Sequence, residues 1–134
     1  MRIGLALLLW LSTMVLILAN SAIGETMIAA ASARAADVYN TVVPLPYVGL
    51  CAWGLARRSP AAGLGDALVV GLLWAVSTIA ADIMAARLLQ GLSWRLAGVH
   101  FRFWDGYLFA LVPFAQLIAP AVAVWLRRRL SATA

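Results

Sequence analysis

Long apolar runs alternate with short polar segments along the 134-residue chain. An α-helix rises about 1.5 Å per residue, so about 20 apolar residues cross a hydrocarbon core about 30 Å thick. The runs have about this length, and they predict four transmembrane helices, at residues 3–23, 38–56, 67–89 and 103–126. We therefore expect an all-α fold: a four-transmembrane-helix bundle that forms a single integral membrane domain over residues 1–134.

The bundle is expected to be organised around residues 67–89, because this mostly apolar run contains one carboxylate, Asp82. A charge inside a membrane helix costs at least about 2.5 kcal/mol, so Asp82 should face protein or a water-filled cavity. Small and polar side chains recur on the same helix face, at Gly71, Ala75, Thr78, Asp82 and Ala85. This face is predicted to meet the neighbouring helices, since small residues let membrane helices approach closely.

The run at residues 38–56 is the weakest of the four, because Asn40, Thr41 and two prolines crowd its start. Proline lacks a backbone N–H and disfavours helical geometry in the residue before it, so a broken or late-starting helix is expected. The preceding residues 27–37 are rich in alanine but carry Arg34 and Asp37. They are predicted to be a surface connection.

Two other polar segments have their own patterns. Residues 57–66 form a turn by composition, and Asp66 suits the exposed amides at the start of the following helix. Residues 90–102 are too polar to span a membrane but carry apolar residues at helical spacing, so an interfacial helix is predicted between the third and fourth membrane helices. In the last run, Pro113 and Pro120 predict kinks that free the carbonyls of Phe109 and Gln116.

Composition agrees with a polytopic membrane protein, because 65% of the residues are hydrophobic and 11% are charged. All ten basic residues are arginines, and the net charge is +5. They cluster at the ends of the apolar runs, which points to membrane topology and not to nucleic acid. The side that holds both termini and the turn at 57–66 carries six of them: Arg2, Arg57, Arg58, Arg127, Arg128 and Arg129. Positive-inside counting therefore predicts that both termini are cytoplasmic.

Enzyme chemistry finds no support in the sequence. There is no HExxH, GxSxG or P-loop motif, and Cys51 is the one cysteine, which excludes an intrachain disulfide or a CxxC site. We expect Cys51 to be a packing residue. His100 is the one histidine and has no partners at metal-ligand spacing, so neither a metal nor a cofactor is predicted.

The predicted topology gathers the remaining polar residues toward the outer face, near Asn40 and Arg95. The candidate polar cluster is Asn20, Glu25, Asp82, Arg87, His100, Arg102 and Asp105. In one interpretation, Asp82 pairs with Arg87 or Arg102 and Glu25 pairs with a remaining arginine, which gives a rigid cap; equal numbers of acids and bases favour it. In the other interpretation, the cluster is an outward vestibule that binds an ion or a small molecule.

Short motifs lie at the ends of the predicted helices: Asn20, Gly24 and Glu25, then Asp82, then Gly91, Ser93 and Trp94. They resemble motifs of an uncharacterised group of small bacterial four-helix integral membrane proteins. That group opens its fourth helix with Asp-Tyr-Asn-x-x-Arg-Gly-Arg-Leu-Trp, where this chain has His100, Phe101, Arg102, Asp105 and Gly106. The acidic and basic residues of this segment thus occupy exchanged positions relative to that group. An ion pair can survive such an exchange, so an internal ion pair is favoured. The resemblance implies four helices in a bacterial inner membrane and no particular activity.

Two functions are therefore expected from the sequence. The first is a non-enzymatic structural or accessory subunit, with the lipid bilayer, other membrane proteins or a second copy of itself as partners. The alternative is a small transporter or binder that uses the vestibule around Asp82 and Glu25. The surroundings of Asp82 discriminate between them: an arginine partner without a cavity favours the subunit, and a polar cavity favours the binder.

Overall fold

The computed structural model describes residues 1–132, which form helices and turns without a strand. Helix α1 continues directly into η1, a π-helical turn, whereas η2 and η3 are single 3-10 turns. The elements in chain order are α1 (Ile3–Ile23), η1 (Gly24–Ile28), α2 (Ala33–Val42), α3 (Pro44–Arg57), α4 (Leu64–Leu89), α5 (Trp94–Ala97), η2 (Val99–Phe101), η3 (Phe103–Asp105) and α6 (Leu111–Ala132).

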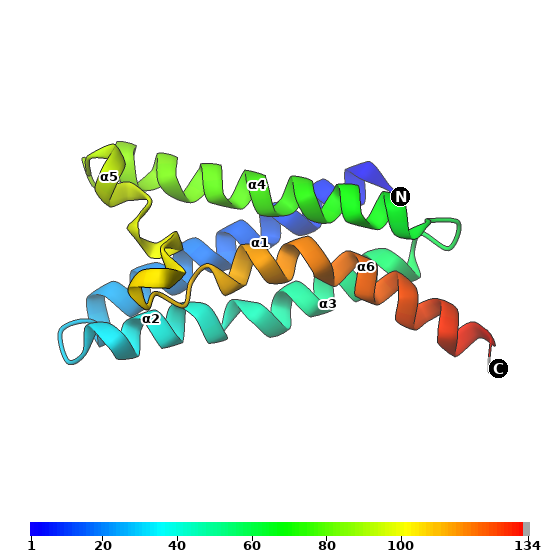
Figure 1. Cartoon of the computed structure of the whole chain (residues 1–134), viewed down its shortest axis with the longest axis horizontal. Coiled ribbons are helices and arrows are strands. Elements are labelled where there is room, and N and C mark those ends of the chain that lie inside the picture. The colour runs from blue at the N-terminus through cyan, green and yellow to red at the C-terminus, as the bar shows by residue number, and fades with distance from the viewer. Residues whose placement is uncertain (133–134) are drawn as a thin grey trace.

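The long helices lie side by side along the long axis of the molecule, and α3 continues the line of α2 (Figure 1). The start of α1, the turn between α3 and α4, and the end of α6 lie at one end, here called the terminal end. The opposite end carries α5, η2 and η3, and we call residues 90–110 the cap. The fold thus has a polar segment at each end of a helical bundle.

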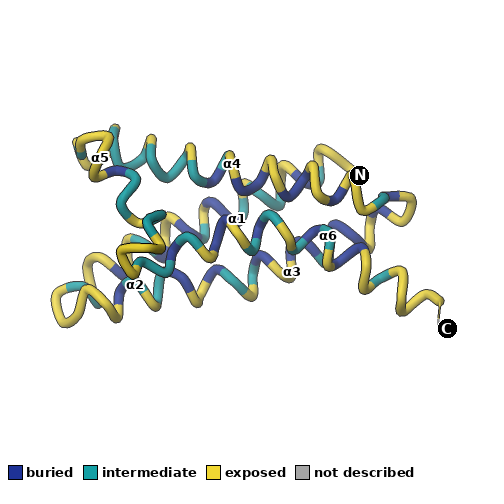
Figure 2. Tube along the Cα trace, in the orientation of Figure 1, coloured by how far each residue is buried: buried dark blue, intermediate teal, exposed yellow. Residues whose placement is uncertain are grey.

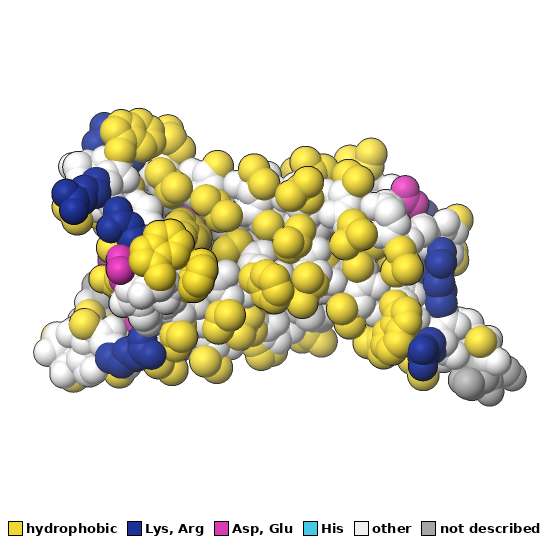
Figure 3. Space-filling model, viewed as in Figure 1, with side chains coloured by type: hydrophobic (Ala, Val, Ile, Leu, Met, Phe, Trp, Pro, Cys, Tyr) yellow, Lys and Arg dark blue, Asp and Glu magenta, His cyan; other side chains and the backbone are white. Residues whose placement is uncertain are grey.

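Three helices of the described chain are long and apolar enough to cross a membrane: Ile3–Ile28, Leu64–Leu89 and Leu111–Ala132. Apolar side chains cover the middle of the visible face, and arginines gather toward its two ends (Figure 3). A surface of this kind matches a hydrocarbon layer between two polar interfaces. The finding supports the predicted membrane protein with transmembrane helices.

The predicted second membrane helix, residues 38–56, is not a single helix. It begins earlier, at Ala33, because Ser32 caps it by accepting a hydrogen bond from the Ala35 N–H at 3.1 Å. Of the surface connection predicted over 27–37, residues 29–32 connect η1 to α2, whereas residues 33–37 already belong to the helix. The expected break lies at Val43, where Pro44 starts α3 and cannot donate a hydrogen bond to the preceding turn.

The prediction for the last run was also partly wrong. The helix expected at 103–126 begins at Leu111 and continues to Ala132, and the interfacial helix expected at 90–102 is reduced to α5 and η2. Gly106 ends η3 with a φ of 88°, a conformation that favours glycine. Pro113 lies in the first turn of α6, where a missing N–H removes no helical hydrogen bond, and the Phe109 carbonyl accepts from Val112 N–H instead of being free.

The core faces inward from every long helix (Figure 2). Helices α4 and α6 approach most closely at Gly71, where an added Cβ would lie about 3.0 Å from the Gln116 carbonyl oxygen and closer still to that of Leu117. Two indole N–H groups join α1 to α4: Trp10 donates to the Thr78 hydroxyl at 3.1 Å, and Trp74 donates to the Ala6 carbonyl at 3.0 Å. These two hydrogen bonds fix the register of α1 against α4.

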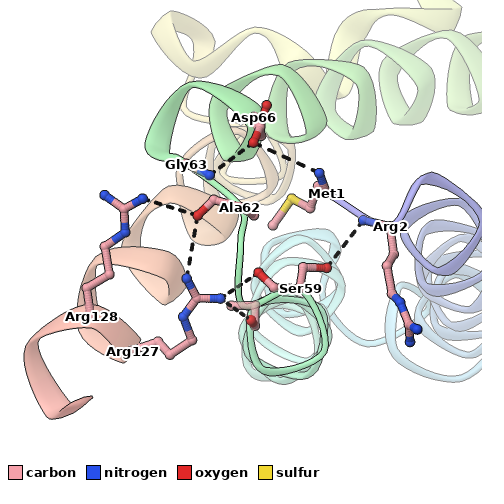
Figure 4. Close-up of polar contacts among 9 residues, drawn as sticks. Met1, Arg2, Ser59, Ala62, Gly63, Asp66, Arg127 and Arg128 are labelled. Carbon is pink, nitrogen blue, oxygen red and sulfur yellow. Dashed lines mark hydrogen bonds and ion pairs between the residues drawn. The ribbon is translucent and has the colours of Figure 1, made fainter.

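At the terminal end, Arg127 closes the bundle (Figure 4). Its guanidinium donates hydrogen bonds to the carbonyls of Ala56 and Ser59, both at 2.6 Å, and to that of Ala62 at 3.5 Å. These carbonyls end α3 and begin the turn to α4. The backbone N–H groups of Ser59 and Ala62 also donate to the carbonyls of Ala56 and Ser59, so Arg127 adds a charged second donor to each of these two. Asp66 accepts the Gly63 N–H at 3.0 Å, which confirms its predicted role at the start of α4.

Candidate functional site

A cavity of about 520 Å³ lies between α1, α2, α4 and the cap. Small and apolar side chains form much of its wall, including Leu18, Leu89 and Phe109. Its titratable groups come from five different elements or turns and are Glu25, Asp37, Asp82, His100 and Tyr107. A pocket of this size, with apolar walls and polar groups set among them, has the dimensions of a small-molecule site.

Two close contacts, one from α1 and one from η1, join this part of the chain to α2 and shape one side of the cavity. Gly24 is buried against the Asn40 side chain, which occupies the space that any Cβ at position 24 would need. Asn20, only 3% exposed, donates to the Asn40 side-chain oxygen at 3.4 Å. These contacts place Glu25, in the π-helical turn that contains Gly24, and Asn40 on the wall of the same cavity.

Asp82 lies partly buried on the opposite helix, α4, and its carboxylate makes no hydrogen bond or ion pair with residues 1–132. The charged groups close enough to act on it electrostatically are His100 and Glu25. Gly71, Ala75 and Thr78 of the predicted small-residue face are buried in the bundle, and the same face continues into the cavity as Asp82 and Ala85. Asp82 therefore faces the cavity and not an arginine.

The predicted arginine partners of Asp82 are engaged elsewhere. Arg87 donates to the Leu92 carbonyl and stacks over the Trp94 ring at 4.6 Å. Arg102 donates to the Arg95 carbonyl at 3.3 Å and forms an exposed ion pair with Asp105 at 3.9 Å. The expected ion pairs of Asp82 with Arg87 or Arg102 were therefore wrong, because both guanidinium groups find carbonyls within the cap.

Asp37 and Arg34 of α2 hold the cap against the bundle, and we call this pair the latch. The Asp37 carboxylate accepts the Leu108 N–H, with distances of 3.1 and 3.3 Å to its two oxygens, and pairs with Arg34 at 3.2 Å. Arg34 in turn donates to the Gly106 carbonyl. The latch fixes the backbone on both sides of Tyr107, whose ring meets His100 edge to face at 5.7 Å between centroids.

Replacing Asp37 with alanine is expected to lower the free energy of unfolding by roughly 2 kcal/mol, because the Leu108 N–H loses a charged acceptor and Arg34 loses its partner. Thermal unfolding in detergent measures the loss, and hydrogen exchange at the Leu108 amide should accelerate. The matched control is Asp105→Ala, whose exposed pair with Arg102 predicts a change below about 0.5 kcal/mol. Equal losses in the two variants would contradict the latch.

The structure brings together only part of the predicted polar cluster. Glu25, Asp82 and His100 line the cavity, and Asn20 supports its wall through Asn40. Three predicted residues lie outside it: Arg87, Arg102 and Asp105.

The predicted polar cluster did not include Asp37, Gln90 and Tyr107, which also line the cavity. A signal for Asp37 is nevertheless present in the sequence. With Ser32 as a helix cap, helical spacing puts four cavity residues on one face of the helix after it: Ala33, Ala36, Asp37 and Asn40.

The acidic groups of the cavity are spread over its walls and do not converge on one point. Within the part of the chain that the structure describes, no three His, Cys, Asp or Glu side chains lie close enough together to hold a metal ion. The arrangement instead leaves room for a larger molecule between carboxylates that come from η1, α2 and α4.

No protein-family model, curated protein or solved structure matches the chain. The resemblance of its short motifs to the small four-helix membrane proteins stays a prediction. The function of the chain must accordingly be inferred from the chemistry of its cavity residues.

Proposed function

We propose that the chain crosses a bacterial inner membrane four times, with α2 and α3 together as the fourth crossing. Together they extend from Ala33 to Arg57, which is about 37 Å of helix at the usual rise. The break at Val43 would lie within the membrane, where Pro44 is tolerated because neighbouring helices surround it. The exposed arginines at the terminal end, Arg57 and Arg58 among them, favour a cytoplasmic location for both termini. The cap then faces outward.

We further propose that the protein is a non-enzymatic binder of small organic cations, which enter the cavity from the outer side. The observation that carries this function is the pair of carboxylates, Glu25 and Asp82, that line one cavity without an arginine partner. An uncompensated negative charge at the edge of a bilayer is costly, and a bound cation would remove that cost. Such a site supports binding, and transport is the extension of it that the sequence also predicts.

The walls of the cavity favour an organic cation over a bare metal ion. Leu18, Leu89 and Phe109 offer apolar surface, and Tyr107 offers an aromatic ring at the same site. A cation with a hydrocarbon body would bury that body against the apolar wall while its charge meets the carboxylates. Quaternary ammonium compounds with an aromatic substituent have this chemistry.

A structural or accessory subunit remains the second candidate, on the strength of the apolar faces that the bundle exposes. Helix α4, for example, exposes Leu68, Leu72 and Val76. Lipid tails cover such a face as well as a partner helix does, so the face by itself does not select a partner. Pull-down from native membranes in mild detergent tests this candidate, which predicts a stoichiometric larger protein.

The cation-binding proposal predicts that Asp82→Asn weakens binding of benzyltrimethylammonium at least tenfold, because the amide keeps the shape of the side chain and removes its charge. Isothermal titration of the purified full chain in mild detergent at pH 8 measures the affinity. The matched control is Asp66→Asn, which removes the same charge at the terminal end and should leave the affinity unchanged. Absence of binding to the unaltered protein at millimolar concentration would refute the proposed function.

A further inference from the structure

His100 supplies the cavity with an imidazole, a group that becomes cationic when it binds a proton. It lines the cavity together with Asp82 and Glu25, and it acts electrostatically on Asp82. Its side chain is exposed, its ring meets Tyr107 edge to face, and neither ring nitrogen makes a hydrogen bond with any described residue. Both nitrogens are therefore accessible to protons from the solvent.

The groups around His100 are acidic on the sides that face the cavity. Glu25 comes from η1, Asp37 from α2 and Asp82 from α4. Asp37 is already paired with Arg34 in the latch, so the carboxylates that lack a cationic partner are Glu25 and Asp82. The nearby Arg95 and Arg102 are joined to each other through the Arg95 carbonyl and do not line the cavity.

We propose that a protonated His100 and the organic cation compete for the carboxylates of this cavity, so that the cation binds as His100 releases its proton to the solvent. The inference rests on the proposed function and adds its regulation. Two positive charges within one small cavity repel each other, and an imidazolium neutralises one of the two carboxylate charges that would otherwise attract the cation. Cation binding is thereby coupled to one proton from His100.

The direction of the pH dependence follows from this competition. Histidine is the side chain whose ordinary charge change falls between pH 5 and 8, and His100 is the one histidine in the sequence. At high pH the imidazole is neutral and the cation binds to free carboxylates. As the pH falls, the imidazolium forms and the affinity for the cation decreases. Binding is therefore strongest on the alkaline side and weakens toward pH 5.5.

Two substitutions at His100 and titration of benzyltrimethylammonium between pH 5.5 and pH 8 test the competition. The unaltered protein should bind at least fivefold more weakly at pH 5.5 than at pH 8. His100→Gln should bind tightly over the whole range with most of that dependence removed, because the amide never becomes charged. His100→Arg keeps a permanent positive charge, and it should bind weakly at every pH. Calorimetry in buffers of different ionisation enthalpy should show proton release in the unaltered protein only.

The outcomes separate the two proposals. If the unaltered protein does not bind the cation at pH 8, the proposed function fails. If it binds at pH 8 and His100→Gln keeps the full pH dependence, the function stands and the competition is overturned. The same conclusion follows if His100→Arg binds as tightly as the unaltered protein. Circular dichroism of each variant confirms that the helices have formed, so a weak binder is not mistaken for an unfolded one.

Discussion

Gly71→Ala is expected to destabilise the protein by about 3 kcal/mol, because the added methyl group has no space between α4 and α6. The added Cβ would lie 2.8 Å from the Leu117 carbonyl carbon and about 3.0 Å from the Gln116 carbonyl oxygen. Both are backbone atoms, so no side chain can rotate away to make room. Helices α4 and α6 would have to move apart, and each would lose dispersion contacts along its length. Thermal unfolding in mild detergent, followed by circular dichroism, measures the loss.

Gly54→Ala is the matched control for this prediction. A Cβ at Gly54 in α3 would meet no atom within 4 Å, so the substitution changes the helix propensity and leaves the packing alone. Alanine is favoured over glycine inside a helix by about 1 kcal/mol, and a small gain in stability is expected. If the two variants unfold at the same temperature, the close contact of α4 with α6 does not limit stability.

The second large effect is expected for Arg127→Ala, at roughly 3 kcal/mol. The substitution removes the donors that the Ala56 and Ser59 carbonyls accept at 2.6 Å (Figure 4). Ala56 is fully buried, so its carbonyl has little access to water as a replacement. A hydrogen bond from a charged donor contributes about 1.5 to 3 kcal/mol, and after the substitution each carbonyl would keep only its backbone donor, the Ser59 N–H at 3.3 Å or the Ala62 N–H at 3.0 Å. The end of α3 should fray, with faster amide exchange between residues 57 and 63.

Arg58→Ala provides the comparison for Arg127. Arg58 is exposed at the same end of the bundle, and its side chain contacts no partner within the described part of the chain. Its loss changes the net charge by the same amount but is expected to shift stability by less than about 0.5 kcal/mol. Similar losses for the two arginines would show that net charge, and not the carbonyl contacts of Arg127, stabilises the terminal end.

The long helices could be predicted from the sequence because their signal is local. The apolar runs at residues 3–23 and 67–89 give the positions of α1 and α4 closely, since length and hydropathy alone decide which segments suit a bilayer. The cap could not be predicted in the same way. The latch joins Arg34 to Gly106, 72 positions away, and Asp37 to Leu108, 71 positions away, so local periodicity contains no trace of these contacts.

The sequence predicted at which end of the bundle the site residues lie, but not which charged groups pair with one another. Counting residues along each helix places Glu25, Asp82 and His100 near one end, and all three line the cavity. Counting charges suggests ion pairs, and this expectation fails because a guanidinium can satisfy its donors on backbone carbonyls, as Arg87 does at Leu92. The acceptor that each of these arginines contacts depends on the conformation of the cap, which the hydropathy pattern did not predict.

The contact of Gly71 with Leu117 also limits where a bound molecule can go. Backbone meets backbone there, on the cytoplasmic side of the cavity in the proposed topology, and neither helix can yield by a side-chain rotation. Under the proposed function a cation enters from the outer side, and its occupancy would follow the concentration in the outer compartment. Under the same proposal this arrangement suits a binder at the outer membrane surface, and passage of a cation between α4 and α6 would require a movement that parts the two helices.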